Sequence, residues 1–294
     1  MNFMAVTIHL QISLTRLASS SSGGENLNTS YLPDWRIWLI AIIIVIGIVL
    51  VGLQNPVPQD PEYHNFADQR ALFHVPNFWN VVSNLLFLAA GAAGLIALYA
   101  RKCPGAIPVL RSSYGVFFIG SALVAIGSAY YHLSPNNETL AWDRFAMTVA
   151  FMAFLAIILG EHINPRLGHL SLPPLLIIGL LSVLVWSVTE AREHGDLRFY
   201  ILVQFLPFIL IPLIVILFPS KLTRIYFVWG ILLCYGIGKV LEFFDAPIYR
   251  TFHLSGHTLK HLIAAVGVFF FVFAIQKRKV IPSSAGDVSP ELKL

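Results

Sequence analysis

Long runs of apolar residues, separated by short polar stretches, follow one another along most of the chain. Eight of these runs have the roughly 17 to 25 residues that a helix needs to cross the hydrocarbon core of a bilayer. They lie at 35–53, 78–99, 113–132, 143–160, 173–190, 199–218, 222–243 and 257–276. The pattern predicts an all-α integral membrane protein. We expect boundary residues at Glu161 and His162, where the fourth run ends, and at Pro173 and Pro174, where the fifth begins.

The runs also predict how the chain is divided. The first run, 35–53, is rich in Ile and Val and almost featureless, so we interpret it as an extra transmembrane anchor in front of a seven-helix core at 78–276. Three mainly polar segments complete the chain. They are an N-terminal tail at 1–34, an outer loop at 54–77 and a cytoplasmic tail at 277–294.

Composition agrees with a membrane protein and argues against a nucleic-acid partner. Hydrophobic residues make up 57% of the chain and charged residues 12%, where soluble domains have about 25% charged residues. The net charge is +4. The basic residues form no stripe, however, and lie mostly between apolar runs, where they set the topology.

Lys and Arg predict which loops face the cytoplasm. Nine of them lie in every second loop, at Arg101, Lys102, Arg111, Arg166, Lys221, Arg224, Lys277, Arg278 and Lys279. Because cytoplasmic loops collect Lys and Arg, both chain ends are expected inside. His132, Asp143, His257 and His261 then all fall at the outer ends of their segments, at one membrane depth.

Three of these residues form a candidate metal site. His257 and His261 are four positions apart, which puts them on one face of a helix. Such a pair is the usual helical way to hold zinc, although two histidines at a helix end can also simply face water. With His132 as a third imidazole and an open fourth position, the set describes a catalytic zinc site.

A zinc hydrolase also needs a base, and the candidate is Asp143. Zinc peptidases with His-Glu-x-x-His carry the base next to the first histidine, but Thr258 occupies that position here. If Asp143 instead binds the metal, the site is closed and structural. Ser128 is a candidate donor to a developing oxyanion. The alternative is that Gly127, Ser128 and Ala129 only allow close helix packing.

Further polar residues lie near the same end of the predicted core. Lys239 and Glu242 are expected to form a pair within one helix, extended by Asp245 and Arg250. A role in orienting the site histidines is the alternative for this group. We assign no role to the loop histidines, including His64.

Together these motifs resemble the signature of the alkaline ceramidase family, within the superfamily of seven-helix membrane hydrolases and progestin/adiponectin-type receptors. The signature residues are Ser128, His132, Asp143, His257 and His261. Asn77-Phe78-Trp79-Asn80-Val81-Val82-Ser83-Asn84 is similar to the ceramidase segment Phe-Trp-Asn-x-x-Ser-Asn, and the stretches 63–70 and 76–78 resemble the bacterial branch. The resemblance covers roughly residues 60 to 276.

The resemblance implies a zinc-dependent hydrolase of a ceramide-like lipid amide in the bilayer. It implies zinc held by His132, His257 and His261, Asp143 accepting a proton from the zinc water, and Ser128 stabilising the oxyanion. The products would be a sphingoid-like amine and a fatty acid. It also implies a bacterial inner-membrane protein whose site faces the non-cytoplasmic side. The alternatives are a lipid ester hydrolase of the same superfamily and a receptor or scaffold that zinc only stabilises.

The chain departs from the animal ceramidases at their calcium-binding segment. That segment ends in a glutamate directly before Phe-Trp-Asn, where this chain has Asn77. Asp60, Glu62 and Asp68 still offer hard oxygen ligands for calcium. The alternative is that the loop is held by ion pairs such as Asp68 with Arg70.

Overall fold

The computed structural model describes residues 34–281. The expected N-terminal tail and most of the C-terminal tail therefore lie outside the described residues. The chain divides into two compact units, Met1–Trp38 and Leu39–Leu294. The second unit contains all the candidate site residues and is described by itself.

The described part of the chain is helical, and eight of its helical segments are long and apolar enough to cross a membrane. This confirms the prediction of an all-α membrane protein. The segments are α2 (Trp35–Gly52), α3 (Phe78–Val82) with α4 (Leu85–Tyr99), η3 (Pro108–Leu110) with α5 (Arg111–Leu133), α6 (Asn137–His162), α7 (Pro165–Glu190), α8 (Arg198–Leu217), α9 (Tyr226–Phe243) and α11 (Gly256–Lys277). Two short helices, η2 (Pro61–His64) and α10 (Asp245–Phe252), lie between them.

Two helices, α6 and α7, begin six and eight residues before their predicted starts. α6 begins at Asn137 instead of 143, because the Asn136 side chain accepts a hydrogen bond from the Thr139 N–H at 3.0 Å in a capping box. α7 begins at Pro165 instead of 173, because Asn164 caps it and Pro165 suits the first turn. The Pro pair at 173 and 174 lies inside the helix. Prolines are tolerated in transmembrane helices, where neighbouring groups satisfy the freed carbonyls.

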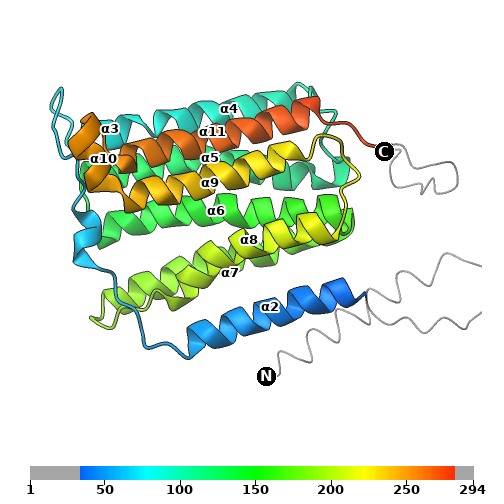
Figure 1. Ribbon diagram of the computed structural model, residues 1–294, viewed down its shortest axis with the longest axis horizontal. Helices are drawn as coiled ribbons and strands as arrows, with labels where there is room; N and C mark the ends of the chain where they lie inside the picture. The colour runs from blue at the N-terminus through cyan, green and yellow to red at the C-terminus, as the bar shows by residue number, and fades with distance from the viewer. Residues whose placement is uncertain (1–33, 282–294) are drawn as a thin grey trace, which may run out of the picture. The chain divides into compact units, whose positions relative to one another are not determined.

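The helices of the core pack side by side (Figure 1). Contacts join α4 to α5, α5 to α6, α6 to α7 and α8, α8 to α9, α9 to α11, and α11 back to α4. In α6, 72% of the most apolar window is buried, against 6% in α2. α6 is therefore the element around which the core packs, and it carries Asp143 near its first turns.

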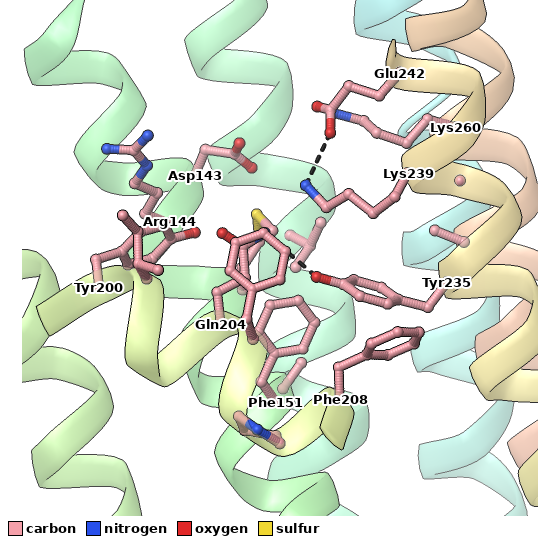
Figure 2. A pocket seen from close by; sticks show the side chains of 18 of the residues that line it. Asp143, Arg144, Phe151, Tyr200, Gln204, Phe208, Tyr235, Lys239, Glu242 and Lys260 are labelled. Atoms are coloured by element: carbon pink, nitrogen blue, oxygen red, sulfur yellow. Dashed lines mark hydrogen bonds and ion pairs between the residues drawn. The ribbon is translucent and has the colours of Figure 1, made fainter. Parts of the chain in front are cut away.

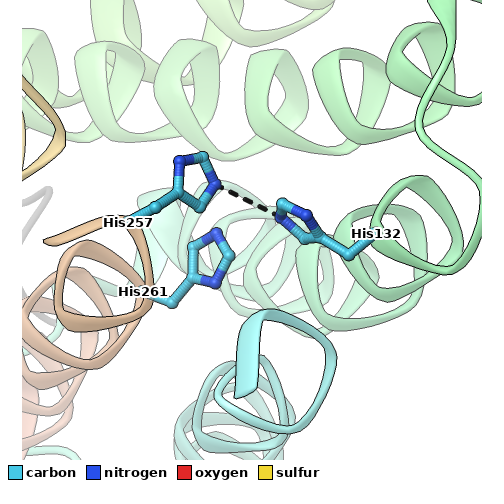
Figure 3. Close-up of side chains that lie close together, drawn as sticks. All are labelled: His132, His257 and His261. Atoms are coloured by element: carbon cyan, nitrogen blue, oxygen red, sulfur yellow. Dashed lines mark hydrogen bonds between the residues drawn. The ribbon is translucent and has the colours of Figure 1, made fainter. Parts of the chain in front are cut away.

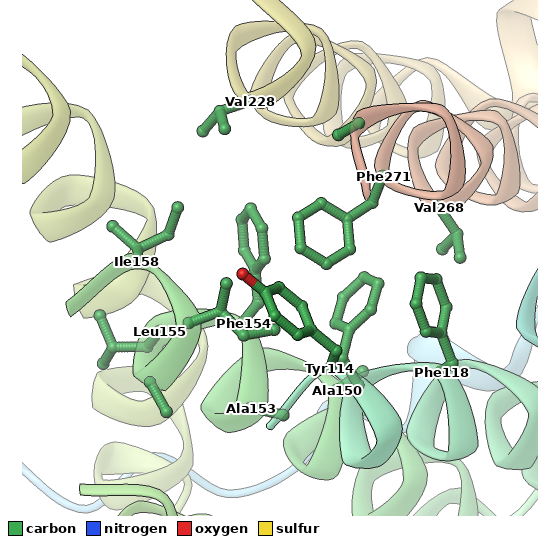
Figure 4. Close-up of a cluster of buried hydrophobic side chains, with 14 of the residues drawn as sticks. Tyr114, Phe118, Ala150, Ala153, Phe154, Leu155, Ile158, Val228, Val268 and Phe271 are labelled. Atoms are coloured by element: carbon green, nitrogen blue, oxygen red, sulfur yellow. The ribbon is translucent and has the colours of Figure 1, made fainter. Parts of the chain in front are cut away.

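An aromatic cluster fills the middle of the core, between α5, α6 and α11 (Figure 4). The Phe271 ring lies 4.9 Å from Phe117, 5.5 Å from Phe154 and 5.8 Å from Phe118, measured between ring centroids. Phe271 is ten residues beyond His261 on α11, which is roughly 15 Å along the helix. The cluster thus holds together the helices that carry the histidines.

A buried ion pair closes the other end of the bundle. The Arg278 guanidinium donates to both Glu161 carboxylate oxygens, at 2.8 and 2.7 Å, and the Tyr114 hydroxyl donates to the same carboxylate at 2.7 Å. Arg278 and Glu161 are buried. Arg278, expected in the cytoplasmic tail, directly follows α11, and its positive charge is neutralised inside the protein.

Candidate metal centre

Three histidines from two distant parts of the chain meet at one end of the bundle (Figure 3). His132 lies in the last turn of α5, and His257 and His261 lie in the first two turns of α11. All three are buried, and one ring nitrogen from each lies within 4.8 Å of the other two. Their ring centroids form a nearly equilateral triangle with sides of 4.9, 4.9 and 4.8 Å. The predicted convergence of His132, His257 and His261 is confirmed.

Side-chain caps fix the start of α11. They thereby fix the position of His257 along the axis of the bundle. The Ser255 hydroxyl accepts from the Thr258 N–H at 2.9 Å, and the Asp245 carboxylate accepts from the His257 N–H at 2.8 Å. A Cβ on Gly256 would lie 2.1 Å from the Leu241 carbonyl oxygen. Only glycine fits there. Asp245 thus caps α11. We predicted instead that it extends the Lys239–Glu242 pair, and this prediction was wrong.

The segment that resembles the ceramidase Phe-Trp-Asn-x-x-Ser-Asn sequence ties the two histidine helices together. The Asn77 side chain donates to the His132 carbonyl at 2.9 Å. Asn80 accepts from the Thr258 hydroxyl at 2.6 Å. The Ser83 hydroxyl lies 2.9 Å from Nδ1 of His261. All these groups are buried, so α3 and its flanks serve as a polar brace behind the imidazoles.

Ser83 also sets which nitrogen of His261 faces the centre. The Ser83 hydroxyl donates its hydrogen to the Asn80 carbonyl at 3.1 Å, so it accepts from Nδ1–H of His261. Nε2 of His261 then keeps its lone pair. This is the orientation that a metal-ligating histidine needs. The sequence does not indicate this role for Ser83, because Ser83 and His261 are 178 positions apart.

The residues present fit a bound metal ion. Nε2 of His132 and Nε2 of His257 lie 3.3 Å apart. Two nitrogens at about 2.0–2.1 Å from a tetrahedral ion lie about 3.3–3.4 Å apart. Three imidazoles suit zinc, copper, iron or nickel better than calcium or magnesium.

A charged group flanks His257. Glu242 accepts from Lys239 at 2.8 Å, as predicted, and also from Lys260 at 2.7 Å. Its carboxylate lies 3.9 Å from Nδ1 of His257, and Nζ of Lys260 lies 3.2 Å from Nε2 of the same ring. The lysine–glutamate group therefore joins α9 to α11 and contacts a ligand residue directly.

The loop before α3 covers the metal centre. The Phe66 ring packs 4.6 Å from His132 and 4.7 Å from His257, between ring centroids. The Ala67 N–H donates to Asp245 at 3.0 Å, which fixes this loop to the start of α11. His64, to which we assigned no role, lies 2.9 Å from the Tyr131 hydroxyl and 2.9 Å from the Asn137 amide oxygen.

Asp143 and Ser128 lie together on the facing sides of α5 and α6. A Cβ on Gly127 would lie 2.7 Å from the Trp142 carbonyl oxygen, so the two helices touch at this level. The Ser128 side chain is a close neighbour of the Asp143 carboxyl. The group of metal-binding atoms contains the three histidines and does not contain Asp143. Gly127 thus makes the close approach between α5 and α6, and Ser128 lies beside it at the same level as Asp143.

An amphipathic cavity of about 450 Å³ opens beside the histidines. This volume is in the range of small-molecule binding sites. Asp143 and His261 both line it, so the candidate base and one candidate ligand border the same space. Figure 2 shows Asp143 among the polar residues of this cavity. Further polar lining comes from Tyr63, Arg144, Gln204, Tyr235 and Lys239. The apolar lining includes Phe117, Met147, Phe154, Phe208, Leu232 and Val268.

The three acidic residues considered for calcium have other partners. Asp60 caps η2 by accepting from the Glu62 N–H at 3.0 Å, and Glu62 accepts from the Asn65 amide at 3.2 Å. Asp68 forms a two-pronged ion pair with Arg70, at 2.9 and 2.6 Å, whose hydrogen bonds raise the pKa of Arg70. Within the described residues, Asp60, Glu62 and Asp68 form no metal-binding group. The ion-pair alternative for Asp68 is confirmed.

No model of a known protein family matches the chain, and no solved structure matches it. The class of protein therefore rests on the fold and the site. The chain is an all-α membrane protein with a buried three-histidine group that could hold a metal ion, next to an amphipathic cavity.

Proposed function

We propose that the protein is a zinc-dependent hydrolase of lipid amides, of the ceramidase type. The observation that carries the proposal is a group of three buried histidines that could hold a metal ion, one of which, His261, lines a cavity together with Asp143. The apolar part of this cavity suits an acyl chain. The polar part would receive the amide and the amine side of a ceramide-like lipid.

When bound at the histidines, zinc would polarise the scissile carbonyl and activate a water. Asp143 would take a proton from the attacking water and deliver it to the leaving nitrogen. The C–N bond breaks and a C–O bond forms, which yields an amine and a fatty acid. Ser128 would donate a hydrogen bond to the oxygen that gains charge. Ser83 would keep His261 in the tautomer and orientation that leave Nε2 free.

The position of Asp143 favours a hydrolase over a receptor or scaffold stabilised by a metal. A fourth protein ligand would close the site, as in structural zinc centres. Asp143 is not part of the metal-binding group, which leaves a fourth position open for water or substrate. An ester hydrolase of the same superfamily would use the same residues, so only substrate tests separate it from an amidase.

The test combines metal analysis with a lipid panel. Purified protein should contain about one zinc ion per chain, and His257→Ala should lose it. Ceramides should be hydrolysed faster than matched O-acyl lipids, and a chelator should stop the reaction. Asp143→Asn should retain zinc and lose at least about 100-fold in turnover, in line with the contribution of a general base. Asp196→Asn, a carboxylate of a surface ion pair with Arg198, is the matched control and should keep full turnover.

Several outcomes would contradict the proposal. Undiminished zinc in His257→Ala would remove that residue from the ligand set. Full activity of Asp143→Asn would exclude it as the base. Zinc binding with no turnover of any amide or ester would favour the receptor or scaffold.

A further inference from the structure

A buried arginine in the same cavity has an unused donor. Arg144 follows Asp143 on α6, is only 5% exposed and lines the cavity. Its Nη2 donates to the Gln59 side-chain oxygen at 2.6 Å. Its Nη1 is buried and has no hydrogen-bond partner among the described residues. A buried donor without a partner is costly and is unusual in a native structure.

The charge of Arg144 also has no ion-pair partner within 4.0 Å among the described residues. Among the described residues, the ion pairs of the site end join Lys239 and Lys260 to Glu242, and none includes Arg144. The guanidinium carbon instead lies 4.1 Å from the Trp186 ring centroid, 4.6 Å from Tyr200 and 5.8 Å from Tyr63. These rings offset part of the cost of burying a cation. The ring faces do not accept the in-plane hydrogens of Nη1. The guanidinium therefore has no negatively charged hydrogen-bond acceptor among the described residues.

Neighbouring hydrogen bonds hold the aromatic rings around the guanidinium in place. The Glu190 carboxylate accepts from the Trp186 indole at 3.1 Å and from the Gln59 N–H at 3.2 Å. The Leu197 N–H donates to the Val57 carbonyl at 2.8 Å, which ties the segment before η2 to the start of α8. The position of the guanidinium is therefore fixed by α7, α8 and the outer loop together.

The Asp143 carboxylate does not take the place of the missing partner. Figure 2 shows the Arg144 guanidinium and the Asp143 carboxylate pointing to different sides of α6. No ion pair within 4.0 Å joins them. The unused donor is thus available to a ligand that enters the cavity.

We propose that Arg144 binds an anionic group of the ligand in this cavity, a carboxylate or a phosphate. The planar fork of arginine, already anchored at Nη2, suits either group. Taken with the proposed hydrolase function, on which this step rests, the substrate class is N-acyl lipids with an acidic group on the amine side. The acyl chain would occupy the apolar part of the cavity, and the acid would lie against Arg144.

Binding to metal-free protein tests the anion site without relying on hydrolysis. Three probes with the same acyl chain are compared by calorimetry: N-palmitoylglycine, N-palmitoylethanolamine phosphate and neutral N-palmitoylethanolamine. Wild-type protein treated with chelator should bind at least one anionic probe about tenfold or more tightly than the neutral one, as expected for a charge-assisted hydrogen bond. The ranking of the two anionic probes shows whether the site takes carboxylate or phosphate.

Variants locate the effect at Arg144. Arg144→Gln should remove the preference, and Arg144→Lys should retain a smaller one because it keeps the charge and loses the fork. Arg250→Gln, an exposed residue on α10 outside the cavity, is the matched control and should behave as wild type. If Arg144→Gln does not fold, the wild-type preference and the Lys variant decide the question.

Three results would overturn the inference. They are equal binding of anionic and neutral probes, a preference that survives Arg144→Gln, and a preference seen only after zinc is added, which would make the metal the anchor. The tests of the proposed hydrolase function and of the proposed anion site can fail independently. Anion-selective binding without turnover of any lipid would leave the anion site in place and remove the hydrolase, while turnover of neutral ceramides by a protein with no anion preference would do the reverse.

Discussion

At the scale of single residues, the candidate ligands were easier to identify than the groups that support them. The spacing of His257 and His261 on one helix face is a local signal. Ser83 is not, because its contact with His261 depends on α3 and α11 lying side by side. Supporting side chains of this kind fix ring orientation and contribute strongly to metal affinity.

Ser83→Ala should therefore weaken zinc binding by roughly 10- to 100-fold, because His261 loses the acceptor for Nδ1–H. Competition with a chromophoric chelator measures the affinity. Ser182→Ala is the control: Ser182 is also buried and donates to a backbone carbonyl of its own helix, at 2.7 Å, but lies on α7. Equal zinc affinity in wild type and Ser83→Ala would show that Ser83 does not orient the ring.

At the scale of helices, the apolar runs located the segments well and their ends less well. A run of apolar residues reports the part of a helix that lies in hydrocarbon. Capping residues such as Asn136 and Asn164 extend α6 and α7 beyond it. The short helix α10 was not predicted, because it is amphipathic and its eight residues are too few to give a periodic signal.

Where two helices touch without side chains between them, a single added methyl group should lower the stability of the protein. A Cβ on Gly168 would lie 2.4 Å from the Gly160 Cα, so Gly168→Ala should push α7 away from α6 and cost about 1–3 kcal/mol in free energy of unfolding. Gly115→Ala provides the comparison. Nothing lies within 4 Å of its Cβ, so the better helix propensity of alanine should leave stability equal or raise it by up to about 1 kcal/mol.

Unfolding in mixed detergent micelles, followed by circular dichroism, measures both glycine variants. A Gly168→Ala protein as stable as wild type would mean that the two helices separate at no cost. In that case the tight crossing would not contribute to the stability of the core.

At the scale of the whole molecule, the topology and the site depend on one another. The histidines and Asp143 lie at one end of the bundle, and Arg278 and Glu161 lie at the other. Because Arg278 is neutralised by Glu161, it no longer counts toward the loop charges that orient a membrane protein. The basic end still carries exposed residues such as Arg101 and Lys102. We therefore propose that the histidine end faces the non-cytoplasmic side.

Cysteine labelling in whole cells tests this orientation. In a Cys103→Ala background, Glu138→Cys at the histidine end should react with a membrane-impermeant maleimide in intact cells. Lys102→Cys at the other end should react only after the membrane is permeabilised. Both positions are exposed, so access to solvent does not distinguish them. The reverse pattern would place the site on the cytoplasmic side.

The sequence by itself determined the class of fold, the positions of the helices and the convergence of three histidines. Hydrophobic length and helical spacing are local properties, and an even number of crossings between His132 and His257 brings them to one end of the bundle. The tertiary structure alone decided what surrounds them: Ser83 behind His261, Phe66 over the rings, Asp143 beside Ser128, and Arg144 without an anion. Which side chains meet across two helices depends on how each helix is rotated and packed. The apolar pattern does not specify this rotation, because apolar residues face lipid on one side of a helix and protein on the other.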